Sequence, residues 1–302
     1  MADTETADWI AVDWGTSTLR AWAMSGGTVL ARAQSDDGMG KLSPDAFSPA
    51  LEALIKDWRV PVGCPVIACG MVGARQGWAE APYHSVPCPP LGGSLTPAPG
   101  AARTVHIIPG LCQSNPPDVM RGEETQIAGF LALNAGWDGV ICLPGTHSKW
   151  VHISAGEIVS FQTFMTGELF ALLADHSVLR HSTSGGGALD TDAFDTALDA
   201  VFSRPERLAA HLFSIRAGDL LTGAPANASR ARLSGLLIGA ELAATRPYWL
   251  GQQVALIGGE AQADLYARAL QTQGVPVTRT DADRMTLAGL TVAYRTLKET
   301  DA

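Results

Sequence analysis

Hydrophobic and polar positions change their spacing several times along the chain, and these changes predict alternating strands and helices. Residues 9–33 form three short apolar runs, interrupted by a polar turn and a Gly-Gly turn, which is typical of three consecutive strands. Elsewhere apolar residues recur every three or four positions, as do Leu51, Leu54 and Trp58, and this spacing predicts helices. The predicted helices cover residues 44–58, 118–133, 166–179, 191–202, 206–216, 229–245, 261–273 and 283–298.

Short apolar runs bounded by glycine or proline predict further, buried strands. Residues 65–69, 105–108 and 254–257 are runs of this kind. Residues 79–103 are rich in proline and glycine, which predicts an extended or loop segment. Because strands alternate with helices throughout, the pattern predicts an α/β fold with mixed sheets, and a second domain is expected to begin near Gly136.

The turn between the first two apolar runs concentrates groups that bind phosphate and metal ions. Asp13 stands near the end of the first run, and Gly15, Thr16, Ser17 and Thr18 follow it. Such a turn offers backbone N–H groups and hydroxyls to phosphate oxygens, next to one carboxylate suited to the water shell of Mg²⁺. The alternative is an ordinary hairpin, in which Asp13 caps the turn by accepting a hydrogen bond from a backbone N–H group.

The same turn pattern occurs a second time, 130 residues further along the chain. Gly145 and Thr146 stand at this offset from Gly15 and Thr16. The other matches at the same offset are Thr18 with Ser148, Gly26 with Gly156 and Val29 with Val159. A repeat spaced this widely suggests two similar domains in tandem. Leu143 stands at the offset of Asp13, so the acid is not duplicated, which fits a single metal site.

Composition and charge narrow the class of protein. With 302 residues, 46% hydrophobic and 17% charged, the chain is long and apolar enough for two globular domains. The net charge of −9 argues against a general nucleic-acid binder, although local cations could still bind an anion. The five cysteines form no Cys-x-x-Cys pair, so a zinc site is not expected, and free thiols fit a cytoplasmic location. No run of about 18 apolar residues predicts a membrane span.

Six strings of residues, spread over nearly the whole chain, support a resemblance to a known family. The most specific are Met-Arg-Gly-Glu-Glu-Thr-Gln, within 118–126, and Pro-Gly-Thr-His-Ser-Lys-Trp, within 143–150. The other four strings are 12–16, 69–78, 164–169 and 256–260. Together they resemble the 2-dehydro-3-deoxygalactonokinase family of the actin-like, sugar-kinase and Hsp70 ATPase superfamily. The resemblance implies two tandem actin-like (ribonuclease H-like) ATPase domains, over residues 9–135 and 136–302, with a cleft between them.

The resemblance also implies a binding site for ATP and Mg²⁺. The first Gly-Thr turn corresponds to one phosphate loop, with Asp13 as the metal ligand, and the second turn corresponds to another. The Gly-Gly pair after residues 254–257 resembles the superfamily's adenosine loop, where the absence of side chains lets purine and ribose lie against the backbone. The residues expected to bind ATP are Gly15, Thr16, Ser17, Thr18, Gly145, Thr146, His147, Ser148, Lys149, Gly258 and Gly259.

A catalytic carboxylate is expected just before the second hairpin, where the superfamily places it. Adjacent side chains on a helix point about 100° apart, so only one of Glu123 and Glu124 can face the site. Glu124 is the first candidate for the base, Glu123 the second and Asp118 the third. Without the resemblance, such a pair of glutamates would be read as a solvated first turn that suits the helix dipole.

The implied substrate is a sugar acid, so cations are expected around it in the first domain. Arg75 is favoured because Gly70, Gly73 and Ala74 leave room for a ligand, and arginine binds a carboxylate through two parallel hydrogen bonds. The alternative is a surface salt bridge. The full set of candidate substrate residues is Arg20, Lys41, Gly70, Met71, Arg75, Trp78 and Arg121.

The implied reaction is phosphorylation of the 6-hydroxyl of 2-dehydro-3-deoxy-D-galactonate by ATP, giving 2-dehydro-3-deoxy-6-phosphogalactonate. Two alternatives remain open: an actin-like-fold phosphatase or hydrolase, and a nucleotide-dependent sensor or assembly protein. A kinase would consume ATP rapidly only when the sugar acid is present. No nucleic-acid or membrane partner is expected, and a homodimer is one possible assembly.

Overall fold

The computed structural model describes residues 6–61 and 63–300, which fall into two compact units. The first unit contains the residues up to Asp138, the segment Ile153–Ser160 and the residues from Ala282 onward. The second contains Gly139–His152 and Phe161–Asp281. The predicted domains, 9–135 and 136–302, are continuous, whereas these units are not.

The first unit contains a six-stranded sheet with the order β3-β2-β1-β4-β7-β6. Neighbouring strands are antiparallel from β1 to β3, and β4 and β7 run parallel to β1. Nearly every residue of β1 and β4 is buried, which explains why both strands read as continuous apolar runs. The strands are β1 (Trp9–Trp14), β2 (Leu19–Ser25), β3 (Thr28–Ser35), β4 (Val66–Gly70), β6 (Thr96–Pro97) and β7 (Val105–Ile107).

A second sheet of five strands repeats this order as β12-β11-β10-β13-β14. β13 is parallel to β10 and to β14. The short connections 144–147 and 155–156 join neighbouring strands as hairpins, as β1 to β3 are joined. The strands are β10 (Gly139–Leu143), β11 (Ser148–Ser154), β12 (Glu157–Phe164), β13 (Val254–Gly258) and β14 (Val277–Asp281). The α/β prediction, with two similar halves, is confirmed.

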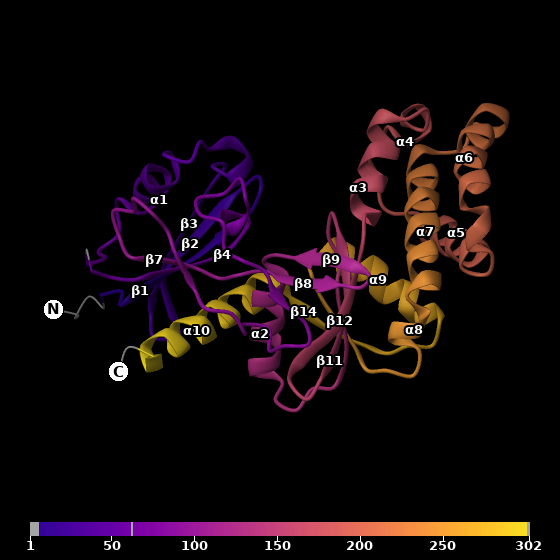
Figure 1. Cartoon of the computed structure of the whole chain (residues 1–302). Coiled ribbons are helices and arrows are strands. Elements are labelled where there is room, and N and C mark those ends of the chain that lie inside the picture. The colour runs from indigo at the N-terminus through magenta and orange to yellow at the C-terminus, as the bar shows by residue number, and fades with distance from the viewer. Residues whose placement is uncertain (1–5, 62, 301–302) are drawn as a thin grey trace. The chain divides into compact units, whose positions relative to one another are not determined.

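Helices pack against the sheets and against one another. In the first unit, α1 (Phe47–Ile55) and α10 (Ala282–Thr300) supply side chains to the core of the six-stranded sheet. α10 belongs to this unit because it packs along α2 (Glu123–Leu133) and against β1, where Trp9 and Tyr294 stack with ring centroids 4.6 Å apart. In the second unit α5, α6 and α7 pack side by side (Figure 1). The remaining helices are α3 (Thr166–Ala171), α4 (Arg180–Thr183), α5 (Thr191–Phe202), α6 (Leu208–Thr222), α7 (Ala226–Ala244), α8 (Arg246–Trp249) and α9 (Glu260–Thr272), with short helical turns η1 (Met39–Lys41), η2 (Met71–Gly73), η3 (Leu172–His176) and η4 (Pro205–Arg207).

The helix predicted over residues 118–133 starts later than expected, which is a correction. Residues Pro117–Met120 form β9, which pairs with β8 (Leu111–Ser114) in a three-stranded sheet that also contains β5 (His84–Ser85). Gly122 separates the strand from α2 with a φ of 104°, a conformation that favours glycine. Asp118 therefore lies in a strand and not on the helix of Glu123 and Glu124.

Two further findings bear on the class of protein. None of the helices in the described part of the chain combines the length and the apolar character that a membrane span requires. All five cysteines are free thiols.

Candidate functional site

The first predicted phosphate loop is the turn between β1 and β2. The N–H of Gly15 donates to the carbonyl of Thr18 at 2.9 Å, so backbone atoms close this turn. The segment before η1 also holds the loop, since the N–H groups of Met39 and Gly40 donate to the carbonyls of Gly15 and Thr16. Thr16, Ser17 and Thr18 are exposed, so their side chains are accessible to a ligand.

Asp13 lies at the end of β1, beside this loop, in an ion-pair network. Its carboxylate pairs with Arg20 on β2, and Arg20 also pairs with Asp283 at the start of α10. Burial raises the pKa of Asp13 above its usual value, while the charge and hydrogen bond of Arg20 act in the opposite direction. Arg20, a candidate substrate residue, is thus held by two carboxylates.

The ends of β1 and β4 and the start of α2 converge beside Asp13. Gly70 ends β4 with a φ of 90°, and a Cβ there would lie 2.8 Å from the carbonyl oxygen of Trp14 and 3.3 Å from Oδ1 of Asp13. A Cβ on Gly122 would lie 3.5 Å from Cα of Gly70. Glycine at both positions therefore allows the two strand ends and the helix start to approach closely.

Glu124, the first candidate for the base, is fully buried at this convergence. Its carboxylate accepts hydrogen bonds from the N–H of Gly122 at 2.6 Å and from the hydroxyl of Thr125 at 3.0 Å. Burial, followed by the charge of Glu123, raises the pKa of Glu124 to about 8. Burial and the charges of Asp13 and Glu124 also raise the pKa of the Cys69 thiol, so both carboxylates lie near that buried residue. The metal candidate and the base candidate therefore lie on segments that meet at Gly70 and Gly122.

The carboxylates of the other two acid candidates accept hydrogen bonds from backbone N–H groups. Glu123 is partly exposed, and its carboxylate accepts from the N–H of Arg121 at 3.1 Å. Asp118 accepts from the N–H of Val119 at 2.8 Å, on β9. These contacts define the start of α2 and the local course of β9.

Arg121 lies beside the loop that follows β4. Its guanidinium stacks over the ring of Tyr83 at 4.5 Å, and Nη2 donates to the carbonyl of Ala81 at 2.8 Å. Nε and Nη1 are buried without a hydrogen-bond partner. A Cβ on Gly73 would lie only 2.7 Å from Nη1, so glycine at that position makes room for the guanidinium. Buried donors without partners are costly, so these two atoms are unusual in a folded protein.

The remaining candidate substrate residues have different surroundings. The side chain of Arg75 is 81% exposed and lies 3.8 Å from Glu80, and Lys41 is exposed. Met71 is partly buried at the start of η2. The prediction that Trp78 lines the substrate site is corrected. Trp78 is buried in the core of the first unit and stacks on Phe47 with ring centroids 5.9 Å apart, so it does not form a wall for a ligand.

The second predicted phosphate loop joins β10 to β11. Thr146 and His147 are exposed, and Nε2 of His147 lies 2.6 Å from the carboxylate of Glu168. Gly167 allows α3 to approach the loop, because a Cβ there would lie 2.3 Å from the carbonyl oxygen of Gly145. Lys149 is only 6% exposed, and its Nζ donates to the carbonyl of His147 at 3.3 Å.

Ser148 does not face a ligand, which corrects its predicted role as a direct phosphate donor. It is fully buried, and its hydroxyl donates to Glu241 of α7 at 2.8 Å. Glu241 lies outside every motif in which the sequence predicted functional residues. The available signal was one acidic residue within the otherwise apolar helical stretch 235–242, a position where burial demands a partner.

A cavity of about 160 Å³ lies beside the second loop. Its wall includes Gly145 of the loop, Thr166 and Gly167 of α3, and Tyr266 of α9. The predicted adenosine loop precedes α9: Gly258 is buried against Pro144, while Gly259 is exposed, and a Cβ there would stand in open space with no contact within 4 Å. A neighbouring hollow of about 280 Å³ shares lining residues with the first cavity, namely Phe170, Ser234 and Leu265.

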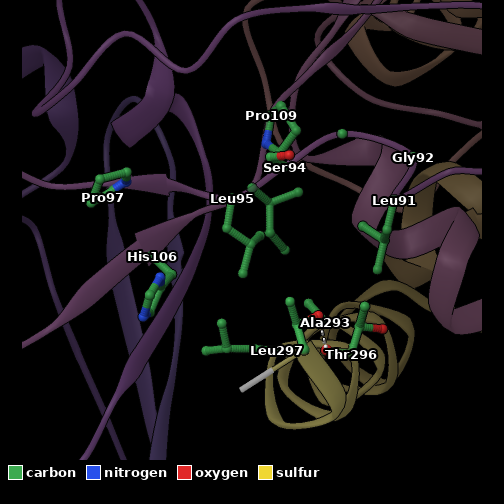
Figure 2. A pocket seen from close by; sticks show the side chains of 13 residues that line it. Leu91, Gly92, Ser94, Leu95, Pro97, His106, Pro109, Ala293, Thr296 and Leu297 are labelled. Carbon is green, nitrogen blue, oxygen red and sulfur yellow. Dashed lines mark hydrogen bonds between the residues drawn. The ribbon is translucent and has the colours of Figure 1, made fainter. Parts of the chain in front are cut away.

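A separate cavity of about 520 Å³ lies in the first unit, between α10 and the segment around residues 91–109 (Figure 2). Leu91, Leu95 and Leu297 give it a largely apolar lining, and His106 lies at its side. None of the candidate site residues described above lines it. Within residues 6–61 and 63–300, no cluster of three or more His, Cys, Asp or Glu side chains is arranged to hold a metal ion.

Comparison with known proteins identifies the family to which the chain belongs. The sequence profile of the family described as 2-keto-3-deoxy-galactonokinase matches residues 13–293. The chain belongs to the 2-keto-3-deoxy-galactonokinase family. The family predicted from the six strings of residues is therefore confirmed, and so is the actin-like fold.

Individual relatives match this chain over nearly its whole length. A Rhizobium meliloti (strain 1021) protein named as a probable 2-dehydro-3-deoxygalactonokinase, DgoK1, is 41% identical over 295 residues, covering 95% of this chain and 96% of that protein. The 2-dehydro-3-deoxygalactonokinase of Escherichia coli (strain K12) is 38% identical over 294 residues, covering 94% and 97%. A crystal structure described as a candidate 2-dehydro-3-deoxygalactonokinase of Sinorhizobium meliloti has a TM-score of 0.91 at 40% identity, covering 96% and 99%.

Proposed function

We propose that this chain is a kinase that transfers the γ-phosphoryl group of ATP to the 6-hydroxyl of 2-dehydro-3-deoxy-D-galactonate. Membership of the 2-keto-3-deoxy-galactonokinase family supports this reaction. The observation that carries the proposal is the convergence at Gly70 of Asp13 and of the start of α2, where Gly122 donates to Glu124. Phosphoryl transfer needs a metal ligand and a residue that orients the attacking hydroxyl in one site.

The residues around Asp13 fit a magnesium ion that arrives with ATP. Mg²⁺ takes oxygen ligands, keeps several waters and uses one or two carboxylates together with substrate phosphates. Asp13 supplies such a carboxylate beside the exposed hydroxyls of Thr16 and Thr18. When bound, the ion neutralises charge on the phosphoryl group.

We assign the following roles to the chain's own residues. The Gly15–Thr18 and Gly145–His147 turns supply backbone N–H groups and hydroxyls to the phosphates, and Gly258 and Gly259 leave space for the adenosine. Glu124 orients the 6-hydroxyl and accepts its proton at the carboxylate. A base whose pKa lies near the working pH is effective in this role.

The two alternatives from the sequence receive less support. A phosphatase or hydrolase would direct water to the site, and a sensor would need no acceptor. Neither explains membership of a kinase family over residues 13–293. The five free thiols support a cytoplasmic location, and a homodimer stays a prediction that light scattering would test.

An ATP-consumption assay with a panel of 2-keto-3-deoxy sugar acids tests the proposed function. ATP consumption is expected to be slow without an acceptor and much faster with 2-dehydro-3-deoxy-D-galactonate. Phosphate appearing in the sugar product, rather than as free phosphate, separates a kinase from a hydrolase. Equal rates with and without every acid in the panel would contradict the proposal.

We propose Arg121, whose Nε and Nη1 are buried without a hydrogen-bond partner, as the carboxylate ligand in place of Arg75. Arg121→Lys is expected to raise KM for the sugar acid about tenfold, because lysine keeps the charge but loses paired donors that are worth roughly 1.5–3 kcal/mol to a charged partner. Arg75→Lys, at an exposed side chain, is the matched comparison and should change this KM less. Steady-state kinetics with both substrates measure the effect, and KM for ATP should stay constant. A larger effect at Arg75 would return the assignment to that residue.

A further inference from the structure

Glu241 has an unusual position for an acidic residue. It lies on α7 among apolar neighbours and is 2% exposed. Oε1 accepts from Nε1 of Trp150 at 2.7 Å, and Oε2 accepts from the hydroxyls of Ser148 and Tyr266, both at 2.8 Å. The hydroxyl of Thr166 is a further hydrogen-bond donor to this carboxylate.

The four donors come from three elements that surround the second phosphate loop. Ser148 and Trp150 belong to β11, which leaves the loop. Thr166 begins α3, and the next residue, Gly167, packs against the carbonyl of Gly145. Tyr266 belongs to α9, which follows the Gly258-Gly259 pair. Thr166 and Tyr266 also line the 160 Å³ cavity beside the loop.

A buried carboxylate at this position has a high desolvation cost. Removing the charge from water costs several kcal/mol, and hydrogen bonds only partly offset that cost. An apolar side chain of similar volume would fill a core position with less penalty, as the flanking Leu242 does on the same helix. Unlike an apolar side chain, a carboxylate orients its neighbours, because its two oxygens fix the orientation of each hydrogen-bond donor.

We propose that Glu241 is a positioning residue for the nucleotide, which holds the second phosphate loop in its binding conformation through Ser148. Ser148 is fully buried and directly follows the exposed Thr146 and His147, so fixing its hydroxyl fixes the end of the loop. The same carboxylate, on α7, joins the loop to α3 and α9, and residues of all three helices line the cavity. The inference rests on the proposed function, because it concerns the loop to which ATP is assigned.

A double-mutant cycle between Glu241 and Ser148 tests this proposal. Dissociation constants for Mg²⁺–ADP are measured by calorimetry for the wild type, Glu241→Gln, Ser148→Ala and the double variant. Glu241→Gln should weaken binding about tenfold, the effect expected for loss of a hydrogen bond to a charged group. Ser148→Ala should weaken binding by a smaller factor. The double variant should bind no more weakly than Glu241→Gln, because both changes act through one contact.

Two further readouts separate positioning from simple stabilisation. KM for ATP should rise in parallel with the dissociation constant, whereas KM for the sugar acid should change less than twofold. Glu206→Gln, at an exposed glutamate of η4, is the matched control and should leave both values unchanged. A lowered thermal midpoint with unchanged Mg²⁺–ADP affinity would overturn the proposal, and so would strictly additive effects.

Each remaining outcome also decides between explanations. If Glu241→Gln does not fold, Ser148→Ala alone still tests the proposal, because it removes the hydroxyl that donates to Glu241 and leaves the carboxylate in place. Unchanged affinity in a folded Ser148→Ala variant would then overturn it. Failure of the wild type to bind Mg²⁺–ADP would instead contradict the proposed function.

Discussion

Replacing Glu124 by glutamine is expected to lower kcat by a factor of about 10² or more, the usual contribution of a general base. Glutamine keeps the size of the side chain and can still accept from the N–H of Gly122, so the start of α2 should persist. It cannot accept a proton from the 6-hydroxyl. KM for ATP should change little, because the predicted phosphate loops lie on other segments of the chain.

The pH dependence of kcat gives an independent check on Glu124. Its pKa is raised to about 8, so the carboxylate is largely protonated at pH 7 and ionises as the pH passes through 8. Activity of the wild type should therefore rise between about pH 7 and 9. The residual activity of Glu124→Gln should lack this rise. A wild-type profile that is flat over this range would contradict the role of Glu124 as the base.

Stability should depend on pH in the opposite direction. With a folded-state pKa of about 8 and an ordinary value of 4.5, the folded state binds more protons than the unfolded state between these values. The free energy of unfolding therefore falls as the pH rises through this window. Glutamine carries no charge at position 124. The thermal midpoint of Glu124→Gln should therefore rise relative to that of the wild type as the pH increases from 5 to 9.

Glu123→Gln and Asp118→Asn are the comparison variants. Both remove a carboxylate that holds a backbone N–H group, so each should cost some stability and less activity than Glu124→Gln. If Glu124→Gln keeps wild-type activity while one of the others is inactive, the base has been assigned to the wrong residue.

The sequence predicted the framework of this site better than its details. The offset between Gly15 and Gly145 identified two hairpins that occupy equivalent places in two sheets. Spacing along the chain, however, does not tell which side chains of a strand or a loop are buried. Ser148 and Trp78 were therefore assigned to ligands although the fold buries both.

Contacts between residues far apart along the chain could not be predicted from the sequence either. Asp283 is 263 residues from Arg20, and Glu241 is 93 residues from Ser148, so no local pattern could pair them. Asp118 was misplaced for a local reason, since the acidic helix pattern concealed β9, which ends at Met120, before Gly122 and α2. Only the fold shows that the substrate candidate Arg20 is bound by the metal candidate Asp13.

Replacing Asp13 by asparagine is expected to abolish phosphoryl transfer while the fold persists. The change keeps the size of the side chain but removes the charge that would hold the metal complex. Arg20 keeps its ion pair with Asp283, and Gly15 and Thr18 still close the turn through backbone atoms. The thermal midpoint should therefore stay within a few degrees of the wild-type value, because removing one buried charge whose pKa burial already raises costs little stability.

Asp283→Asn is the matched control for this prediction. It removes the other carboxylate of Arg20 but leaves Asp13 charged, so kcat and the Mg²⁺ concentration needed for half-maximal activity should change far less than in Asp13→Asn. Measuring kcat, the Mg²⁺ dependence and the thermal midpoint together distinguishes the possible roles of Asp13. Equal loss of activity in both variants would mean that the ion-pair network matters more than a metal ligand. A collapsed midpoint in Asp13→Asn alone would assign Asp13 to the stability of the hairpin, and retained turnover would exclude it from the metal site.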